Sequence, residues 1–397
     1  MEAGLSHGSN LVSKPRYEVL DGLRGVAALL VVWYHVNEGF AFAAGETMVM
    51  GLNHGYLAVD FFFMLSGFVI DYAYRDRWND KNFGVGRFLI RRLIRLHPML
   101  IFGAVLGVIS FVIQGSVQWD GTHVAISMIM LALLCAILMV PAVPRVSAYE
   151  IRGNGEMFPL NGPSWSLFFE YIGNIIYALI IRRLSNGALI VVTVLLSIGW
   201  GAFAIYDVAG YGTIGVGWTL DTVNLSGGLL RMLCPFTIGM LISRYFRPLS
   251  CITVKGAFWL CSFALIVLYS VPFLPILNGV FEALCIIVIF PAIVYLGASS
   301  NSEESLNKTV GRAPSGYYRV IKFLGGISYP LYAVHYPLMY LFYAWMIDSG
   351  QHSLDATWIF VLIVCASSLI IAWAAWRFYD TPVRKALYSL LRNRLKS

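Results

Sequence analysis

Two ionisable residues, Arg24 and His35, lie in the first long apolar stretch of the sequence. Eleven residues of α-helix turn through about 1,100° and rise about 16 Å, so both side chains lie on one face at different depths. Ionisable groups buried at such depth usually face a cavity or a pathway. Neutral imidazole acts as a general base or as a nucleophile. We therefore interpret His35 and Arg24 as catalytic candidates; a histidine hydrogen-bonded within the core is the alternative.

Three acidic or basic residues in other apolar stretches are further candidates. Asp60 lies in the second stretch, and an unpaired buried carboxylate is expensive. It is expected to pair with Arg24, to orient His35 in catalysis, or to form a purely structural pair. Glu170 and His335 are also intramembrane ionisable groups that could bind a substrate or support the site.

A basic run follows the second apolar stretch. Arg91 and Arg95 are spaced i, i+4, so one helix face presents two guanidinium groups to anionic oxygens, with Arg92 beside them. One interpretation is a phosphate-binding site made by Arg91, Arg92 and Arg95. The other is a cytoplasmic topology signal, because short cytoplasmic loops carry an excess of Lys and Arg.

The elements that must position these residues are transmembrane helices. The chain has 397 residues, of which 58% are hydrophobic and 12% charged, whereas soluble domains carry about 25% charged residues. Nucleic-acid binding is excluded as an explanation of the net charge of +7, because the Lys and Arg residues sit in short segments between apolar runs. Eleven apolar stretches are expected to form helices: 20–42, 55–74, 97–114, 123–142, 165–181, 187–206, 228–243, 256–273, 276–297, 323–346 and 357–379.

The positive-inside rule conflicts with eleven simple crossings, because strict alternation would place the later basic loops outside. We therefore predict an all-α polytopic bundle with ten full crossings and one re-entrant or partial element between 97 and 164. Both termini are then cytoplasmic, with an N-terminal tail over 1–19, a transmembrane domain over 20–380 and a basic C-terminal tail over 381–397. Irregular backbone at membrane depth is tolerated where it lines a cavity, so this element also points to the site.

Five motifs, spread in order along the chain, resemble those of the integral-membrane acyltransferase-3 family of O-acyltransferases. Each match is weak alone, and the set is specific. They are Leu20-Asp21-Gly22-Leu23-Arg24 followed by His35; the run from Ala58 to Phe68; the basic run from Phe88 to Pro98; Pro163-Ser164-Trp165-Ser166-Leu167 with Glu170; and Ser328-Tyr329 through Leu331-Tyr332 to His335. Ala58 stands where the family usually has Gly.

The resemblance implies a membrane-bound enzyme of the bacterial inner membrane that transfers an acyl group, with acetyl expected, from acyl-CoA to a carbohydrate hydroxyl. It implies that Arg91, Arg92 and Arg95 bind acetyl-CoA. It also implies that the acceptor approaches past Trp165, Ser166 and Glu170, with Tyr332 and His335 as further contacts, although Trp165 could equally be an interfacial belt residue. Direct attack and an acyl-histidine route both fit. No metal-ligand spacing is present. A transporter or channel without chemistry is the alternative function.

Overall fold

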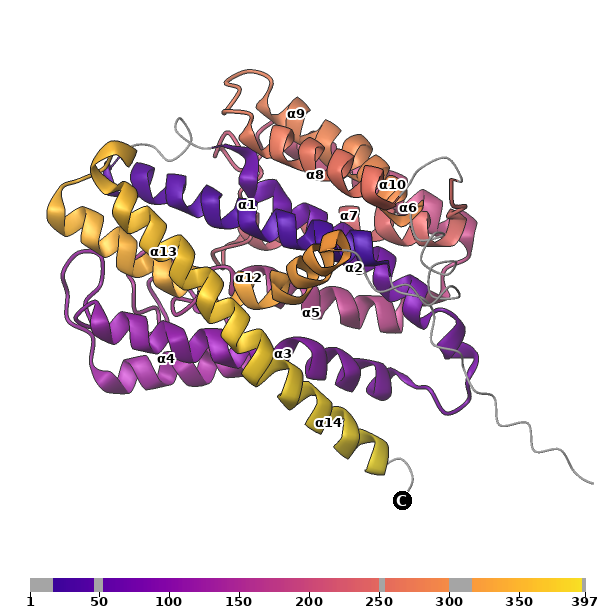
Figure 1. Ribbon diagram of the computed structural model, residues 1–397, viewed down its shortest axis with the longest axis horizontal. Coiled ribbons are helices and arrows are strands. Elements are labelled where there is room, and N and C mark those ends of the chain that lie inside the picture. Colours follow the sequence, from indigo (N-terminus) through magenta and orange to yellow (C-terminus); the bar gives the residue numbers. More distant parts are fainter. Residues whose placement is uncertain (1–16, 46–52, 250–253, 300–315, 395–397) are drawn as a thin grey trace, which may run out of the picture.

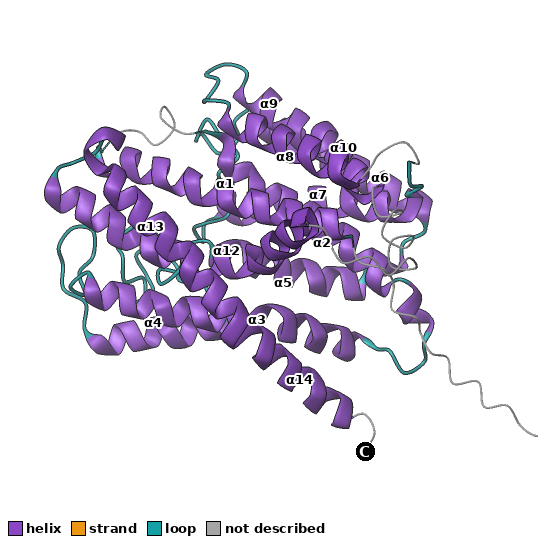
Figure 2. Cartoon of the chain, viewed as in Figure 1, coloured by secondary structure: helices purple, strands orange, loops and turns teal. Residues whose placement is uncertain are grey.

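The computed structural model describes residues 17–45, 53–249, 254–299 and 316–394, and these ranges contain helices and no strand (Figures 1 and 2). The first half contains α1 (Glu18–Ala43), η1 (His54–Leu57), α2 (Ala58–Tyr74), η2 (Asp76–Asn79), α3 (Val85–Ile113), α4 (Ile126–Leu138), α5 (Ser164–Leu179), η3 (Ile181–Arg183) and α6 (Asn186–Ile205). The second half contains α7 (Thr222–Tyr245), α8 (Val254–Ser270), α9 (Asn278–Leu284), a π-helical turn η4 (Cys285–Ile289), α10 (Phe290–Ser299), α12 (Gly316–Ser349), α13 (Leu354–Ala374), a second π-helical turn η5 (Ala375–Asp380) and α14 (Thr381–Arg394).

Eight helical segments within these ranges are long and apolar enough to cross a membrane. They are Glu18–Ala43, His54–Asn79, Val85–Ile113, Ser164–Arg183, Asn186–Ile205, Thr222–Tyr245, Asn278–Ser299 and Leu354–Asn393. The shorter α8 and the 34-residue α12, which contains Pro330 and Pro337, run through the same bundle. The protein is therefore an all-α polytopic membrane bundle, as the composition predicts.

Two close helix pairs organise the bundle. Helix α12 packs along α1 and also contacts α3 and α13, so it lies at the centre of the molecule (Figure 1). Helix α2 packs along α7. A Cβ atom at Gly67 would overlap the Phe236 carbonyl, and one at Gly239 would overlap the Met64 carbonyl. These two glycines therefore let the α2 and α7 backbones touch, as small residues do in membrane helix pairs.

The expected irregular element is α4 and the segment 140–163. Helix α4 has 13 residues, about 20 Å, which is shorter than the roughly 30 Å hydrocarbon core of a bilayer. The chain leaves it through Met139 in a left-handed conformation (φ 55°). It then returns to the end of α3, where Trp119 N donates to the Arg152 carbonyl (3.2 Å) and Arg152 donates to Gln114 (2.9 Å). Helix α4 and this segment thus form an excursion from one end of α3.

The C-terminal segment differs from the expected tail, because 381–394 forms α14, continuous with α13 through η5 (Figure 1). The Tyr388 hydroxyl donates to the Arg91 carbonyl of α3 (3.3 Å), and Arg384 pairs with the buried Asp380 (2.8 Å). Packing against α3 therefore orders this part of the chain. Most of the N-terminal tail, residues 1–16, and the last three residues lie outside the described residues.

Candidate active site

A cavity of about 620 Å³ opens between α1, α12, the segment 140–163 and the α6–α7 connection. Its volume lies within the range of small-molecule sites, roughly 300–1,000 Å³. Its lining is rich in aromatic rings and contains a few polar groups. The residues used below are Tyr34, His35, Glu38, Tyr56, Val59, Trp119, Asn154, Glu156, Trp165, Trp218, Arg231, Tyr332, Tyr336, Tyr340 and Tyr343.

His35 lies in this cavity and contacts a carboxylate. Its Nδ1 lies 2.7 Å from Oε2 of Glu38, one turn further along α1. The hydroxyls of Tyr343 (3.2 Å) and Tyr336 (3.3 Å) donate to the same Glu38 oxygen. A carboxylate on Nδ1 holds the tautomer in which Nε2 has a free lone pair. The pair therefore has the arrangement of a base and its orienting group.

His335 stands beside His35 and away from the cavity lining. The two imidazole centroids are 5.2 Å apart, and His335 is fully buried. Its Nδ1 lies 3.0 Å from the Leu331 carbonyl, whereas its buried Nε2 has no partner among the described residues. The structure therefore places His335 behind His35, at a position where it cannot reach a molecule in the cavity directly.

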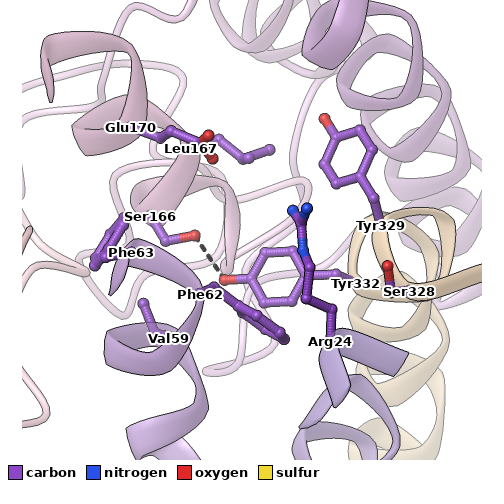
Figure 3. Close-up of a pocket in the computed structure, with 10 residues that line it drawn as sticks. All are labelled: Arg24, Val59, Phe62, Phe63, Ser166, Leu167, Glu170, Ser328, Tyr329 and Tyr332. Carbon is purple, nitrogen blue, oxygen red and sulfur yellow. Dashed lines mark hydrogen bonds between the residues drawn. The ribbon is translucent and has the colours of Figure 1, made fainter. Parts of the chain in front are cut away.

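A smaller pocket of about 40 Å³ lies next to the large cavity and contains Arg24 (Figure 3). Both are lined by Val59 and Tyr332, so these side chains form a shared wall. The Tyr332 hydroxyl is held by Ser166 Oγ (2.6 Å) and the Pro163 carbonyl (3.2 Å). The guanidinium of Arg24 forms no ion pair with a described carboxylate and points into the same space as Tyr329 and Glu170 (Figure 3).

Glu170 lines this smaller pocket and not the large cavity. It accepts from Arg92 (2.7 Å) and from Ser66 Oγ (3.0 Å). The physical reason is that a carboxylate in the middle of α5 needs a cation, and α3 supplies one. Arg92, which the sequence predicts to bind donor phosphate, is therefore already paired with Glu170. Neither Arg91 nor Arg95 makes an ion pair within the described ranges, and Arg95 lies over the Tyr329 ring (5.8 Å).

Asp60 pairs with Arg231 of α7, and its expected pairing with Arg24 or contact with His35 is not observed. The guanidinium of Arg231 contacts both Asp60 oxygens (3.0 Å at the shortest) and also donates to the Tyr56 carbonyl (2.8 Å) and the Val216 carbonyl (3.1 Å). Both side chains are almost fully buried. The Trp165 ring lies 5.1 Å from the guanidinium carbon. Arg231 therefore forms part of the cavity wall, with Asp60 buried behind it.

Two buried charged residues of the segment 140–163, Arg152 and Glu156, both contact Tyr340. Arg152 lies over the Tyr340 ring (3.3 Å) and donates to the Pro159 carbonyl (2.6 Å). Glu156 accepts from the Tyr340 hydroxyl and from Asn154 (2.9 Å). Burial raises the pKa of Glu156 to about 7, against the opposing effect of Arg152 and these hydrogen bonds. The irregular segment thus brings a titratable group to the cavity.

The comparisons with known proteins agree with this arrangement. A sequence model of the family described as "Acyltransferase domain" matches residues 17–377, nearly the whole chain. The chain belongs to this acyltransferase family. No solved structure matches it.

Three relatives of this acyltransferase-family chain come from different bacteria. "Protein 2 in picA locus" of Rhizobium radiobacter is 34% identical over 41% of this chain and 81% of that protein. "Peptidoglycan O-acetyltransferase OatA" of Listeria monocytogenes is 26% identical over 92% of this chain and 55% of that protein. "Acyltransferase MdmB" of Streptomyces mycarofaciens is 30% identical over 39% of this chain and 37% of that protein. The Listeria relative matches nearly the whole of this chain, and the chain spans about half the length of that relative.

Sequence reasoning missed three charged residues of this acyltransferase-family site. Glu38 is three residues after His35 in an apolar stretch, so helical spacing could have identified it. Arg231 is 171 positions from Asp60, and Glu156 lies in irregular backbone. Only tertiary structure brings these two residues to the cavity.

Proposed function

We propose that the protein transfers an acetyl group from acetyl-CoA to a hydroxyl of a carbohydrate acceptor at the membrane. The observation that carries this proposal is the pair of cavities that meet at Val59 and Tyr332. One contains Arg24, which has no ion-pair partner among the described residues, and the other contains His35 with its carboxylate partner. Such a pair of compartments suits a reaction between two substrates that approach from opposite sides.

The smaller pocket suits the donor. Burying a guanidinium without a carboxylate partner costs free energy, and contact with an anion or a polarised carbonyl offsets this cost. Arg24 has no such partner among the described residues, and Arg91 and Arg95 lie on the same side of the bundle. The phosphates of coenzyme A carry the charge that these groups would bind. Arg92 would serve the donor site through Glu170, by shaping its wall.

The larger cavity suits the acceptor. Aromatic rings and a few polar groups line it, and its carboxylates, Glu38 and Glu156, are hydrogen-bond acceptors for hydroxyl groups. A relative along nearly the whole chain is named a peptidoglycan O-acetyltransferase, which supports a carbohydrate acceptor. Trp165 and Tyr332 would then form the wall on which the acceptor rests, with Ser166 holding the Tyr332 hydroxyl from the side of the smaller pocket, while His335 would support His35 from behind.

His35 would act as the base. Its Nε2 takes the proton from the acceptor hydroxyl as the oxygen attacks the thioester carbonyl. The new C–O bond forms, the C–S bond breaks, and the proton passes from His35 to the departing thiolate of coenzyme A. Glu38 on Nδ1 stabilises the imidazolium formed in between. The same atoms also permit an acyl-histidine intermediate, which a trapping experiment would detect.

The test uses the purified full chain in proteoliposomes with radiolabelled acetyl-CoA and an extract of bacterial surface glycans. The wild type is expected to transfer label to glycan. His35→Ala is expected to transfer it at least about a thousandfold more slowly. Asn37→Ala, on the same helix and outside the cavity lining, is the matched control. Full transfer by His35→Ala would contradict the assignment of His35, and absence of label transfer by the wild type would contradict acetyl-CoA as donor.

A further inference from the structure

Helix α14 lies beyond residues 17–377, which match the family, yet it packs beside the arginines of α3. The α13–α14 segment runs for 40 residues, from Leu354 to Asn393, which is about 60 Å and twice the roughly 30 Å thickness of the hydrocarbon core. Its last part therefore projects past the core on the side where α3 begins (Figure 1). The structure thus adds a helix to the donor side of the bundle.

The contact between α14 and α3 fixes which residues face each other. The Tyr388 hydroxyl donates to the Arg91 carbonyl (3.3 Å), and the two helices run in opposite directions (Figure 1). One turn before Tyr388 on α14 is Arg384, and one turn after Arg91 on α3 is Arg95. In an antiparallel pair these two side chains lie at the same level.

The charges at this level are unbalanced. Arg384 is within electrostatic range of Arg95, and Arg95 is within range of Arg24. Asp380 pairs with Arg384 through one oxygen (2.8 Å) and is also within electrostatic range of Arg95, which has no ion pair of its own among the described residues, so one carboxylate faces two guanidinium groups. The buried Nε atoms of Arg384, Arg91 and Arg92 have no hydrogen-bond partner within the described ranges. Like charges held together with free donors are stabilised by a bound anion.

We propose that Arg384 of α14 and Arg95 of α3 together bind a phosphate group of the acyl donor. This rests on the proposed use of acetyl-CoA and adds a contact from outside the family-matched region. Guanidinium groups from two helices present their N–H donors to phosphate oxygens. Asp380 pairs with Nη2 of Arg384, and the Nε donor of Arg384 has no hydrogen-bond partner among the described residues. An anionic lipid headgroup carries the same phosphate chemistry, so the experiment must separate the two ligands.

The experiment measures the Kd of coenzyme A, and of pantetheine, which lacks the phosphates, for the full chain in nanodiscs of phosphatidylcholine. Arg384→Gln is expected to raise the Kd of coenzyme A about tenfold and to leave that of pantetheine unchanged. The double variant Asp380→Asn/Arg384→Gln, which leaves no carboxylate unpaired, is expected to show the same loss. Lys385→Gln removes the same charge from the adjacent, exposed position and is expected to bind coenzyme A as the wild type does.

Three results would overturn the proposal. If Arg384→Gln and Lys385→Gln bind coenzyme A equally well, Arg384 makes no phosphate contact. If the double variant regains wild-type affinity, Arg384 serves only as the partner of Asp380. If Arg384→Gln instead loses phosphatidylglycerol retained in native mass spectra, with coenzyme A affinity unchanged, the site binds lipid. A wild type that binds no coenzyme A is a different failure, because it removes the proposed donor itself.

Discussion

At the scale of single residues, Glu38 decides how His35 can act. Its carboxylate contacts Nδ1 at 2.7 Å and is itself held by two tyrosine hydroxyls. These hydroxyls fix the carboxylate, and the carboxylate fixes the imidazole ring. The geometry therefore makes Glu38 a positioning residue whose effect on transfer passes through His35.

Glu38→Gln is expected to lower kcat by roughly ten- to a hundredfold with little change in KM, because the amide no longer stabilises the imidazolium. Glu38→Asp keeps the carboxylate and should recover part of the rate. Steady-state kinetics of the wild type and both variants check this prediction through the separate values of kcat and KM. A Glu38→Asp variant no faster than Glu38→Gln would mean that Glu38 has only a structural role.

Asp60 and Arg231 are expected to act through stability. Removing one partner of a buried ion pair costs about 3–5 kcal/mol, so Asp60→Asn should lower the Tm in detergent markedly. The double variant Asp60→Leu/Arg231→Met removes both charges and should regain much of that loss. Thermal unfolding of the single and double variants checks this. Asp60→Asn with an unchanged Tm and no transfer activity would instead support the catalytic role that the sequence leaves open for Asp60.

The candidate site could be predicted only where its parts are close in sequence. The spacing of Arg24 and His35 identifies one helix face, because helical periodicity is a local property. The partner of Asp60 could not be predicted, since Arg231 lies on a helix 171 positions away and several cations compete in sequence. The partner of Glu170 could not be predicted for the same reason: its depth in α5 is a local property, but its pairing with Arg92 is not.

At the scale of elements, the segment 140–163 brings the polar residues Asn154 and Glu156 to the cavity from outside the regular helices. Arg152 and Glu156 lie in irregular backbone stabilised by contacts with the end of α3 and with α12. Their hydrogen bonds replace those that a helix would supply, as backbone inside a membrane protein requires. The stability of this segment therefore depends on the charge of Glu156.

The raised pKa of Glu156 determines whether the stability of the protein rises or falls with pH. Because burial raises the pKa from 4.5 to about 7, the folded state favours the protonated form. Its stabilising contribution is complete below about pH 4.5 and is lost as the pH rises through about 7. From about pH 5 to about pH 8 the wild type should lose roughly 2–3 kcal/mol more than Glu156→Gln. Tm measurements of both proteins across this range check it, and parallel curves would contradict it.

At the scale of the whole molecule, the helix pattern was largely predictable because spanning helices are specified by long apolar runs. Each of the eleven apolar stretches contains a helix, and the irregular element lies between 97 and 164 as the loop charges require. The course of 381–394 was not predictable, because a basic polar segment gives no signal of the α3 surface on which it packs. The orientation in the bilayer stays a prediction.

Cysteine labelling tests that orientation. In a cysteine-free background, cysteines at Asp221, Asp355 and Val146 should react with an impermeant thiol reagent from outside. Val146 is 78% exposed, so a thiol at this position is open to the reagent. Cysteines at Lys308 and Lys396, which lie outside the described residues, should react only after permeabilisation. Labelling of position 396 in intact cells, with position 221 protected, would invert the bundle and place the Arg24 pocket on the outer side.

The glycine contact between α2 and α7 has a consequence for motion. Backbones that touch at Gly67 and Gly239, and that are joined by the Asp60–Arg231 ion pair, cannot slide or rotate past each other without breaking both. Helices α2 and α7 therefore move as one rigid unit. Any movement that opens a passage between the two cavities must then occur in the facing wall, where the Tyr332 hydroxyl of α12 is held by hydrogen bonds to Ser166 and Pro163. We expect a turnover cycle to begin with rotation of that one tyrosine.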